Sequence, residues 1–106
     1  MRFMKVQILF FDSCPSHEAA LDLLEGVLDE VGWDGEVDPV HVDTPEQAEE
    51  LEFRGSPTFL LDGVDPFADT DSPVGMSCRV YTTRNGLEGV PDRHDLLRVV
   101  REAMGR

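Results

Sequence analysis

The segment FFDSCPSH, residues 10–17, decides the fold, because it places a cysteine between two stretches of different apolar pattern. Before that cysteine, Lys5 to Phe11 (KVQILFF) is nearly continuous in apolar residues, which predicts a strand buried on both faces. After it, apolar residues recur at helical spacing, which predicts an amphipathic helix that starts at Ser13 or Cys14 and ends near Gly32. The apolar positions of that helix are Ala20, Leu21, Leu24, Val27, Leu28 and Val31. Residues 10–17 therefore predict a strand-to-helix turn that carries a thiol.

The next stretch repeats the alternation of strand and helix. Glu36 to Val42 (EVDPVHV) predicts a second strand, and Pro39 within it lacks a ladder donor, which predicts a position at the edge of the sheet. The segment TPEQ, residues 44–47, predicts a helix start with a capping box and a proline in the first turn. This short helix is expected to end around residues 52–54.

The C-terminal half predicts two more strands and a final helix. Thr58 to Leu61 (TFLL) predicts the third strand and Cys78 to Thr82 (CRVYT) the fourth, with a long loop, Val64 to Ser77, between them. Arg84 to Gly86 predicts a turn, and Pro91 to Met104 predicts a helix that stops at glycine. Its inner face is expected to carry Leu96, Val99, Val100 and Ala103.

The predicted order of elements is β-α-β-α-β-β-α, and no linker or repeat divides the chain. One domain over residues 1–106 is expected. The first β-α-β unit requires parallel strands and a right-handed crossover, and the third and fourth strands are close enough in the chain to pair antiparallel. The sequence thus predicts an α/β fold in which helices flank a four-stranded mixed sheet; if the first strand is central, Pro39 falls on an edge strand.

Composition excludes several classes of partner. The chain has 106 residues with 22 acidic and 9 basic side chains, a net charge of −13. Such a field repels nucleic acids and anionic membranes, so neither is an expected partner. The N-terminal residues 1–6 lack the features of a signal peptide, and no apolar run is long enough to span a membrane. Two cysteines make no disulfide framework, so a soluble cytoplasmic protein without a cofactor is expected.

The element order, with a cysteine after the first strand, resembles the thioredoxin fold. A second match is FRGSPTFLLDG, residues 53–63, which resembles the segment that carries the cis-proline of thioredoxins and glutaredoxins. In that family the cis-proline faces the active cysteine, and the backbone before it pairs with the bound peptide or glutathione. The resemblance implies that Pro57 is the cis-proline and that Ser56, Pro57 and Pro15 contact the substrate.

The motif itself departs from the family, since His17 stands where the second cysteine of a Cys-x-x-Cys pair would be. Cys14 is the candidate nucleophile, because a helix N-terminus stabilises a thiolate, although the charges of Asp12 and Glu18 oppose it. The alternative is a small apolar side chain at a strand end. His17 is expected in the first helical turn, either as a proton acceptor or hydrogen-bond donor for the thiol or as an ordinary polar residue.

Cys78 is the second thiol, and the minimal fold places it at the far end of the sheet from Cys14, as a half-buried strand residue. The loop before it could instead fold back and make it the resolving cysteine. A metal site would need Cys14 and His17 with Cys78, His41 or His94, and no such convergence is expected.

These residues predict a thiol-dependent redox protein in which Cys14 exchanges disulfides with a small-molecule thiol or a partner protein. One alternative is a non-catalytic binding module that presents the Cys14–Pro57 groove or the loop of residues 64–77. Another is the binding of a soft metal, mercury or copper, by Cys14 and Cys78. That alternative rests on GMSCRVY, residues 75–81, which resembles small bacterial thioredoxin-like proteins sometimes grouped with organomercurial lyases.

Overall fold

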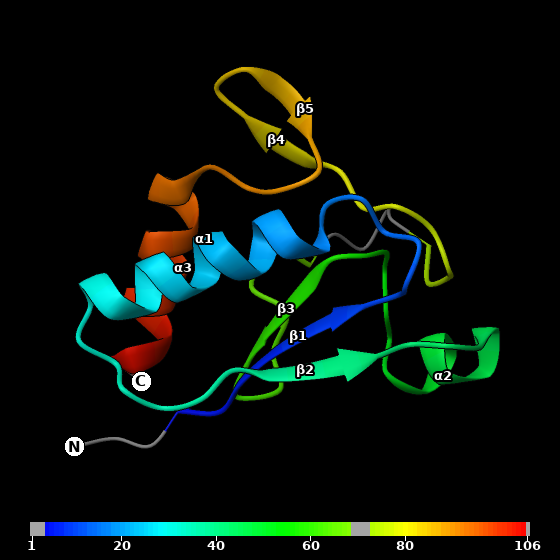
Figure 1. The fold of residues 1–106 in the computed structure, drawn as a ribbon, viewed down its shortest axis with the longest axis horizontal. Helices are drawn as coiled ribbons and strands as arrows, with labels where there is room; N and C mark the ends of the chain where they lie inside the picture. Colours follow the sequence, from blue (N-terminus) through cyan, green and yellow to red (C-terminus); the bar gives the residue numbers. More distant parts are fainter. Residues whose placement is uncertain (1–3, 69–72, 106) are drawn as a thin grey trace.

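The computed structural model describes residues 4–68 and 73–105. It shows an α/β arrangement with a three-stranded mixed sheet, flanking helices and a separate two-stranded hairpin (Figure 1). The elements are β1 Val6–Phe10, α1 His17–Glu30, β2 Asp38–His41, α2 Pro45–Glu50, β3 Thr58–Leu61, β4 Tyr81–Thr83, β5 Gly86–Glu88 and α3 Arg93–Met104. Of the expected loop, Val64 to Ser77, residues 69–72 lie outside the described part, as do residues 1–3 of the N-terminus.

The three-stranded sheet has the order β2-β1-β3, with β1 in its centre. β1 pairs parallel with β2 and antiparallel with β3. Pro39, which pairs in register with Ile8, lies on the edge strand β2, where its missing N–H breaks no ladder on the outer side. The predicted edge position of the second strand is therefore confirmed.

Two apolar clusters cover the two faces of this sheet. α1 and α3 pack side by side over one face, where Val6 and Ile8 of β1 contribute to the larger cluster (Figure 1). Leu9 points to the opposite face, because successive strand residues alternate, and packs there with Val42, Ala48 of α2 and Phe53. α2 and the chain around residue 53 therefore close the second face near the end of β1 where the cysteine follows.

α1 begins later than the sequence predicted. Its first residue is His17 and its N-cap is Ser16, whose carbonyl accepts from the N–H of Ala20 at 2.9 Å. The N–H of Cys14 instead bonds the carbonyl of Phe11 at 3.1 Å, which closes a turn before the helix. Cys14 and Pro15 thus precede the helix rather than form its first turn, so the predicted start at residue 13 or 14 was wrong.

The other helices follow the prediction closely. The capping box of α2 is present, since the N–H of Gln47 donates to Thr44 Oγ1 at 3.1 Å and the N–H of Thr44 donates to Gln47 Oε1 at 3.2 Å. α2 ends at Glu50, two residues before the expected limit. α3 starts after the N-cap Asp92 and buries the predicted inner face of Leu96, Val99, Val100 and Ala103.

The expected fourth strand of the sheet was a wrong prediction. In the described residues the sheet has three strands, and β4 pairs antiparallel with β5 in a hairpin of its own. Residues 77–79 lie in an extended segment that makes one parallel bridge, Ser56 to Cys78, just before β3. The turn at residues 84–85 lets the chain pair locally, so β4 never reaches the long edge of β3.

Across residues 4–68 and 73–105, none of the helices combines the length and the apolar character that crossing a membrane requires.

Candidate functional site

Cys14 lies in the turn between β1 and α1, at the C-terminal end of the central strand. Its side chain belongs to the core, with 4% of the residue exposed. Pro15, which follows it, is exposed at the surface. A reagent in solution therefore has little direct access to the Cys14 thiol.

The segment before β3 approaches the same turn. The Ser56–Pro57 peptide bond is cis, in agreement with the expectation for Pro57. The hydroxyl of Ser56, which is 1% exposed, accepts a hydrogen bond of 3.4 Å from the N–H of Phe11. Thr58 adds a bond of 2.6 Å from its hydroxyl to the carbonyl of Gly55. These contacts connect the turn that carries Cys14 to the segment that carries Pro57.

Cys78 lies beside this segment and not at the far end of the sheet, which corrects the expectation from the minimal fold. The N–H of Ser56 donates to the carbonyl of Ser77 at 2.8 Å, and the N–H of Arg79 donates to the carbonyl of Ser56 at 2.9 Å. The thiol of Cys78 is free and the residue is exposed.

The backbone of Ser56 is therefore already paired within the chain. Both its donor and its acceptor bond residues of the 77–79 segment, which is where the resemblance to thioredoxins implied a bound substrate. An extended peptide can pair with Ser56 only if residues 77–79 move aside.

Arg79 fixes that segment in place. Its guanidinium donates to Asp65 at 2.7 Å, to the Thr58 hydroxyl at 3.2 Å and to the Phe67 carbonyl at 2.6 Å. It also lies 4.9 Å from the centre of the Tyr81 ring, within the range of a cation–π contact. With the side chains of Arg79 and Asp65 exposed by only 8% and 13%, this ion pair is largely shielded from water.

Tyr81 is a second residue, after Arg79, that attaches this part of the chain to the segment that carries Pro57. Its hydroxyl donates to the carbonyl of Pro57 at 2.6 Å. Burial raises the pKa of Tyr81 well above its usual value, the nearby Arg79 charge lowers it, and the negative charges of Asp65 and Cys14 raise it further. The phenol therefore remains a donor at neutral pH.

Close packing at Gly55 explains a glycine at this position. Its φ is +116°, and a Cβ there would lie 3.0 Å from both the Cβ of Arg79 and the carbonyl oxygen of Ser77. Only a residue without a side chain lets the 77–79 segment lie this close to the chain before Pro57.

His17 supports the backbone of Cys14. Because a carbonyl oxygen can only accept, the His17 Nδ1 donates to the carbonyl of Cys14 at 3.1 Å. The imidazole stacks on the ring of Phe10 with centroids 4.7 Å apart. His17 was expected to be a hydrogen-bond partner of the Cys14 thiol. The hydrogen bond that it donates goes to the main-chain carbonyl of Cys14.

The remaining histidines make no metal centre with the thiols. The two ring nitrogens of His41 contact Asp12 at 2.6 Å and Asp43 at 2.9 Å. Throughout the described part of the chain, no three His, Cys, Asp or Glu side chains are grouped as metal ligands would be. His94 lies in α3, beside a hollow between the start of that helix and the turn end of the β4–β5 hairpin.

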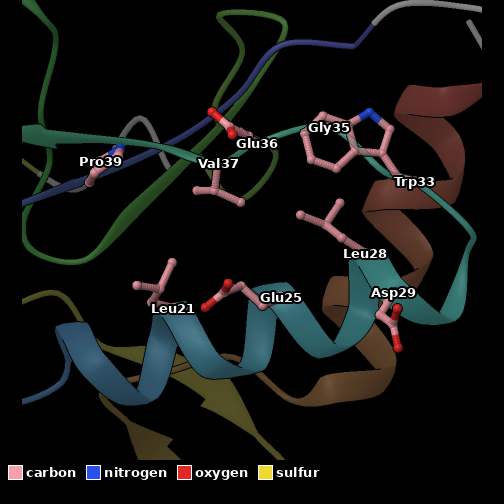
Figure 2. Close-up of a pocket in the computed structure, with 9 residues that line it drawn as sticks. All are labelled: Leu21, Glu25, Leu28, Asp29, Trp33, Gly35, Glu36, Val37 and Pro39. Carbon is pink, nitrogen blue, oxygen red and sulfur yellow. The ribbon is translucent and has the colours of Figure 1, made fainter.

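Sequence reasoning missed Arg79 and Tyr81, because an alternating strand pattern says nothing about which loop its side chains will contact. It also missed a hollow of about 430 Å³ between α1 and the chain that leads into β2 (Figure 2). Leu21, Leu28 and Val37 point into the gap, and the Glu25 carboxylate lies at its opening. The full lining is Leu21, Glu25, Leu28, Asp29, Trp33, Gly35, Glu36, Val37 and Pro39. Cys14 is not part of it.

No protein-family model, curated protein or solved structure gives a match to this chain. The chemistry of the site is therefore inferred from its own residues and contacts.

Proposed function

We propose that this chain is a thiol-dependent redox protein of the thioredoxin-like class, in which Cys14 is the nucleophile of thiol–disulfide exchange. Its exchange partner is a small-molecule thiol or a thiol or disulfide of another protein, in the reducing environment of the cytoplasm. The observation that carries the proposal is that the turn ending at Cys14, through Phe11, and the segment carrying Cys78 both bond Ser56, the residue before Pro57.

Each residue of the site has a part in this chemistry. The thiolate of Cys14 attacks one sulfur of a disulfide, the other sulfur leaves as a thiolate, and a mixed disulfide remains on the protein. His17 holds the carbonyl of Cys14 and so fixes the turn. Pro15 is exposed next to Cys14, whereas the buried Ser56 and Pro57 contact the partner only when residues 77–79 move aside. A small disulfide needs less displacement of residues 77–79 than an extended peptide does.

The strong negative charge limits the partners further. With a net charge of −13, the chain repels nucleic acids and anionic membrane surfaces, and neither is part of the proposal.

Turnover of a small disulfide tests the proposal. The reduced protein is mixed with glutathione and a low-molecular-weight disulfide, and the rate of disulfide reduction above the uncatalysed rate is measured. We expect Cys14→Ser to abolish the catalysed rate, whereas Ser13→Ala, in the same turn, retains it. Because Cys14 is buried, Cys14→Ala is measured as well, and urea unfolding shows whether each variant is folded. A folded Cys14 variant that turns over at the wild-type rate rules out this assignment.

The burial of Cys14 favours a second candidate, a non-catalytic binding module. In that case the thiols take no part, and the hollow between α1 and β2 receives a ligand with an apolar body and a positive charge. Trp33 lines this hollow and is the only tryptophan of the chain, so its fluorescence reports occupancy. An aromatic amine is expected to change this emission, and Leu28→Asp to prevent the change, if the second candidate is correct. Unchanged emission at saturating amine eliminates it.

A further inference from the structure

We propose that Cys78 is the thiol that first meets an outside disulfide, and that Cys14 then takes the disulfide over from Cys78. This relay rests on the proposed redox function of Cys14. It reverses the order expected from the sequence, in which Cys14 reacts first and Cys78 resolves.

The difference in exposure between the two thiols determines which of them reacts first. Cys78 is exposed, whereas Cys14 is 4% exposed and packed in the core. Exchange between thiols and disulfides depends on access to the attacking sulfur as well as on its thiolate fraction. An outside disulfide therefore encounters Cys78 without any movement of the core.

Contacts of both cysteine-bearing segments with the same residue support the transfer of the disulfide from Cys78 to Cys14. Cys78 pairs in register with Ser56, the hydroxyl of Ser56 accepts from the N–H of Phe11, and the carbonyl of Phe11 accepts from the N–H of Cys14. Tyr81, three residues after Cys78, donates a hydrogen bond to the carbonyl of Pro57. The turn that ends at Cys14 and the segment that carries Cys78 thus both bond Ser56, although they are far apart in sequence.

Hydrogen bonds and an ion pair hold the segment around Cys78 beside Ser56. The backbone bonds of Ser56 fix residues 77 and 79, and the guanidinium of Arg79 is anchored by Asp65. Successive residues of an extended segment point to opposite sides. The inward, buried side chain of Arg79 therefore directs the preceding side chain, Cys78, to the exposed side.

The chemistry balances in two exchanges. The thiolate of Cys78 attacks one sulfur of a disulfide RSSR, which forms Cys78–SR and releases RS⁻. The thiolate of Cys14 then attacks the Cys78 sulfur, which forms the Cys14–Cys78 disulfide and releases the second RS⁻. The two protein thiols lose two electrons and two protons in total, and RSSR becomes two RSH. The final bond requires Cα atoms within about 7 Å of each other.

The test is a quenched time course with glutathione disulfide as the oxidant. The reduced protein is sampled with acid, remaining thiols are alkylated, and peptides are identified by mass spectrometry. In the wild type we expect the Cys78–glutathione adduct first and the Cys14–Cys78 disulfide later. Cys14→Ser is expected to stop at the Cys78 adduct. Cys78→Ser is expected to slow the oxidation of Cys14 about tenfold or more, because access limits the reaction. Ser77→Ala, next to Cys78, is the matched control and should follow the wild type.

The outcomes separate the relay from the underlying function. If Cys14 forms a glutathione adduct at the same rate with and without Cys78, the redox function stands and the relay is overturned. A wild-type protein whose Cys14 never enters a disulfide overturns both. The order of adducts in the wild type decides the relay even if a Cys14 variant does not fold.

Discussion

The hydroxyl of Tyr81 donates a 2.6 Å hydrogen bond to the carbonyl oxygen of Pro57. This bond joins the first residue of the β4–β5 hairpin to the proline at the start of β3, two segments that share no strand pairing. Pro57 is buried, so its carbonyl has no access to water as a substitute partner. The contact is one of the attachments that keep the 77–79 segment beside Ser56.

The first prediction concerns the stability of the protein at high pH. The folded state binds the phenolic proton of Tyr81 more tightly than the unfolded state, because burial raises its pKa. This contribution is complete below the unfolded-state value near 10 and is lost as the pH rises further, at up to about 1.4 kcal/mol per pH unit. Tyr81→Phe should remove that slope and cost about 1–2 kcal/mol at neutral pH, because the Pro57 carbonyl loses its donor.

Urea unfolding between neutral pH and pH about 11 measures both effects. Tyr81 is the only tyrosine of the chain, so tyrosinate absorbance reports its ionisation alone. An absorbance change complete at the pH of free tyrosine would show that the side chain is not buried as described.

The second prediction concerns Gly55, compared with Gly63. Both glycines have positive φ, +116° and +79°, but a Cβ at Gly63 meets nothing within 4 Å, whereas one at Gly55 meets Ser77 and Arg79. Gly63→Ala should cost about 1–2 kcal/mol, the backbone penalty alone. Gly55→Ala should cost clearly more, because the 77–79 segment is pushed away. Equal free energies of unfolding for the two variants would contradict the close approach at Gly55.

The third prediction concerns the buried ion pair of Arg79 and Asp65. Arg79→Met leaves the carboxylate of Asp65 shielded from water without its cation, which should cost about 3 kcal/mol or more. The control is Arg98→Met, which breaks an exposed pair with Glu102 in α3 and should cost less than about 0.5 kcal/mol. Denaturant unfolding of the two variants measures the difference. Similar costs would mean that the Arg79 pair is solvated in solution.

The fourth prediction concerns His17. His17→Phe retains the stacking on Phe10 and loses the hydrogen bond to the Cys14 carbonyl, so the free energy of unfolding should fall by about 1 kcal/mol. The rate of Cys14 exchange should fall while its pH profile keeps the same shape, because His17 acts on the backbone. If His17 accepts the thiol proton instead, the pH profile of exchange changes shape in the variant, and a stopped-flow series over pH distinguishes the two roles.

Much of the fold could be read from local patterns. The edge position of Pro39 follows from its missing N–H, and the capping box of Thr44 and Gln47 follows from residues three apart in the chain. The start of α1 could not be read in the same way, because the turn from Phe11 to Cys14 competes with the first helical turn for the same backbone donors.

The position of Cys78 is the clearest example of a feature that local sequence patterns could not predict. An apolar-polar alternation in residues 78–82 is compatible with a central strand or with a short hairpin. The long loop before these residues leaves open on which side of the sheet the chain re-enters the fold. The choice depends on contacts with Asp65, Phe67 and Ser56 that are distant in sequence.

The sequence by itself determined the alternation of strands and helices, the edge position of the strand with Pro39 and the thiol in the turn after the first strand, because each depends on periodicity, capping, turn chemistry or the missing N–H of a proline. Only the tertiary structure decided that Cys14 is buried, that Cys78 is exposed beside Ser56, and that Arg79 and Tyr81 hold it there. Burial and long-range pairing arise when separate segments pack together, so no local pattern encodes them.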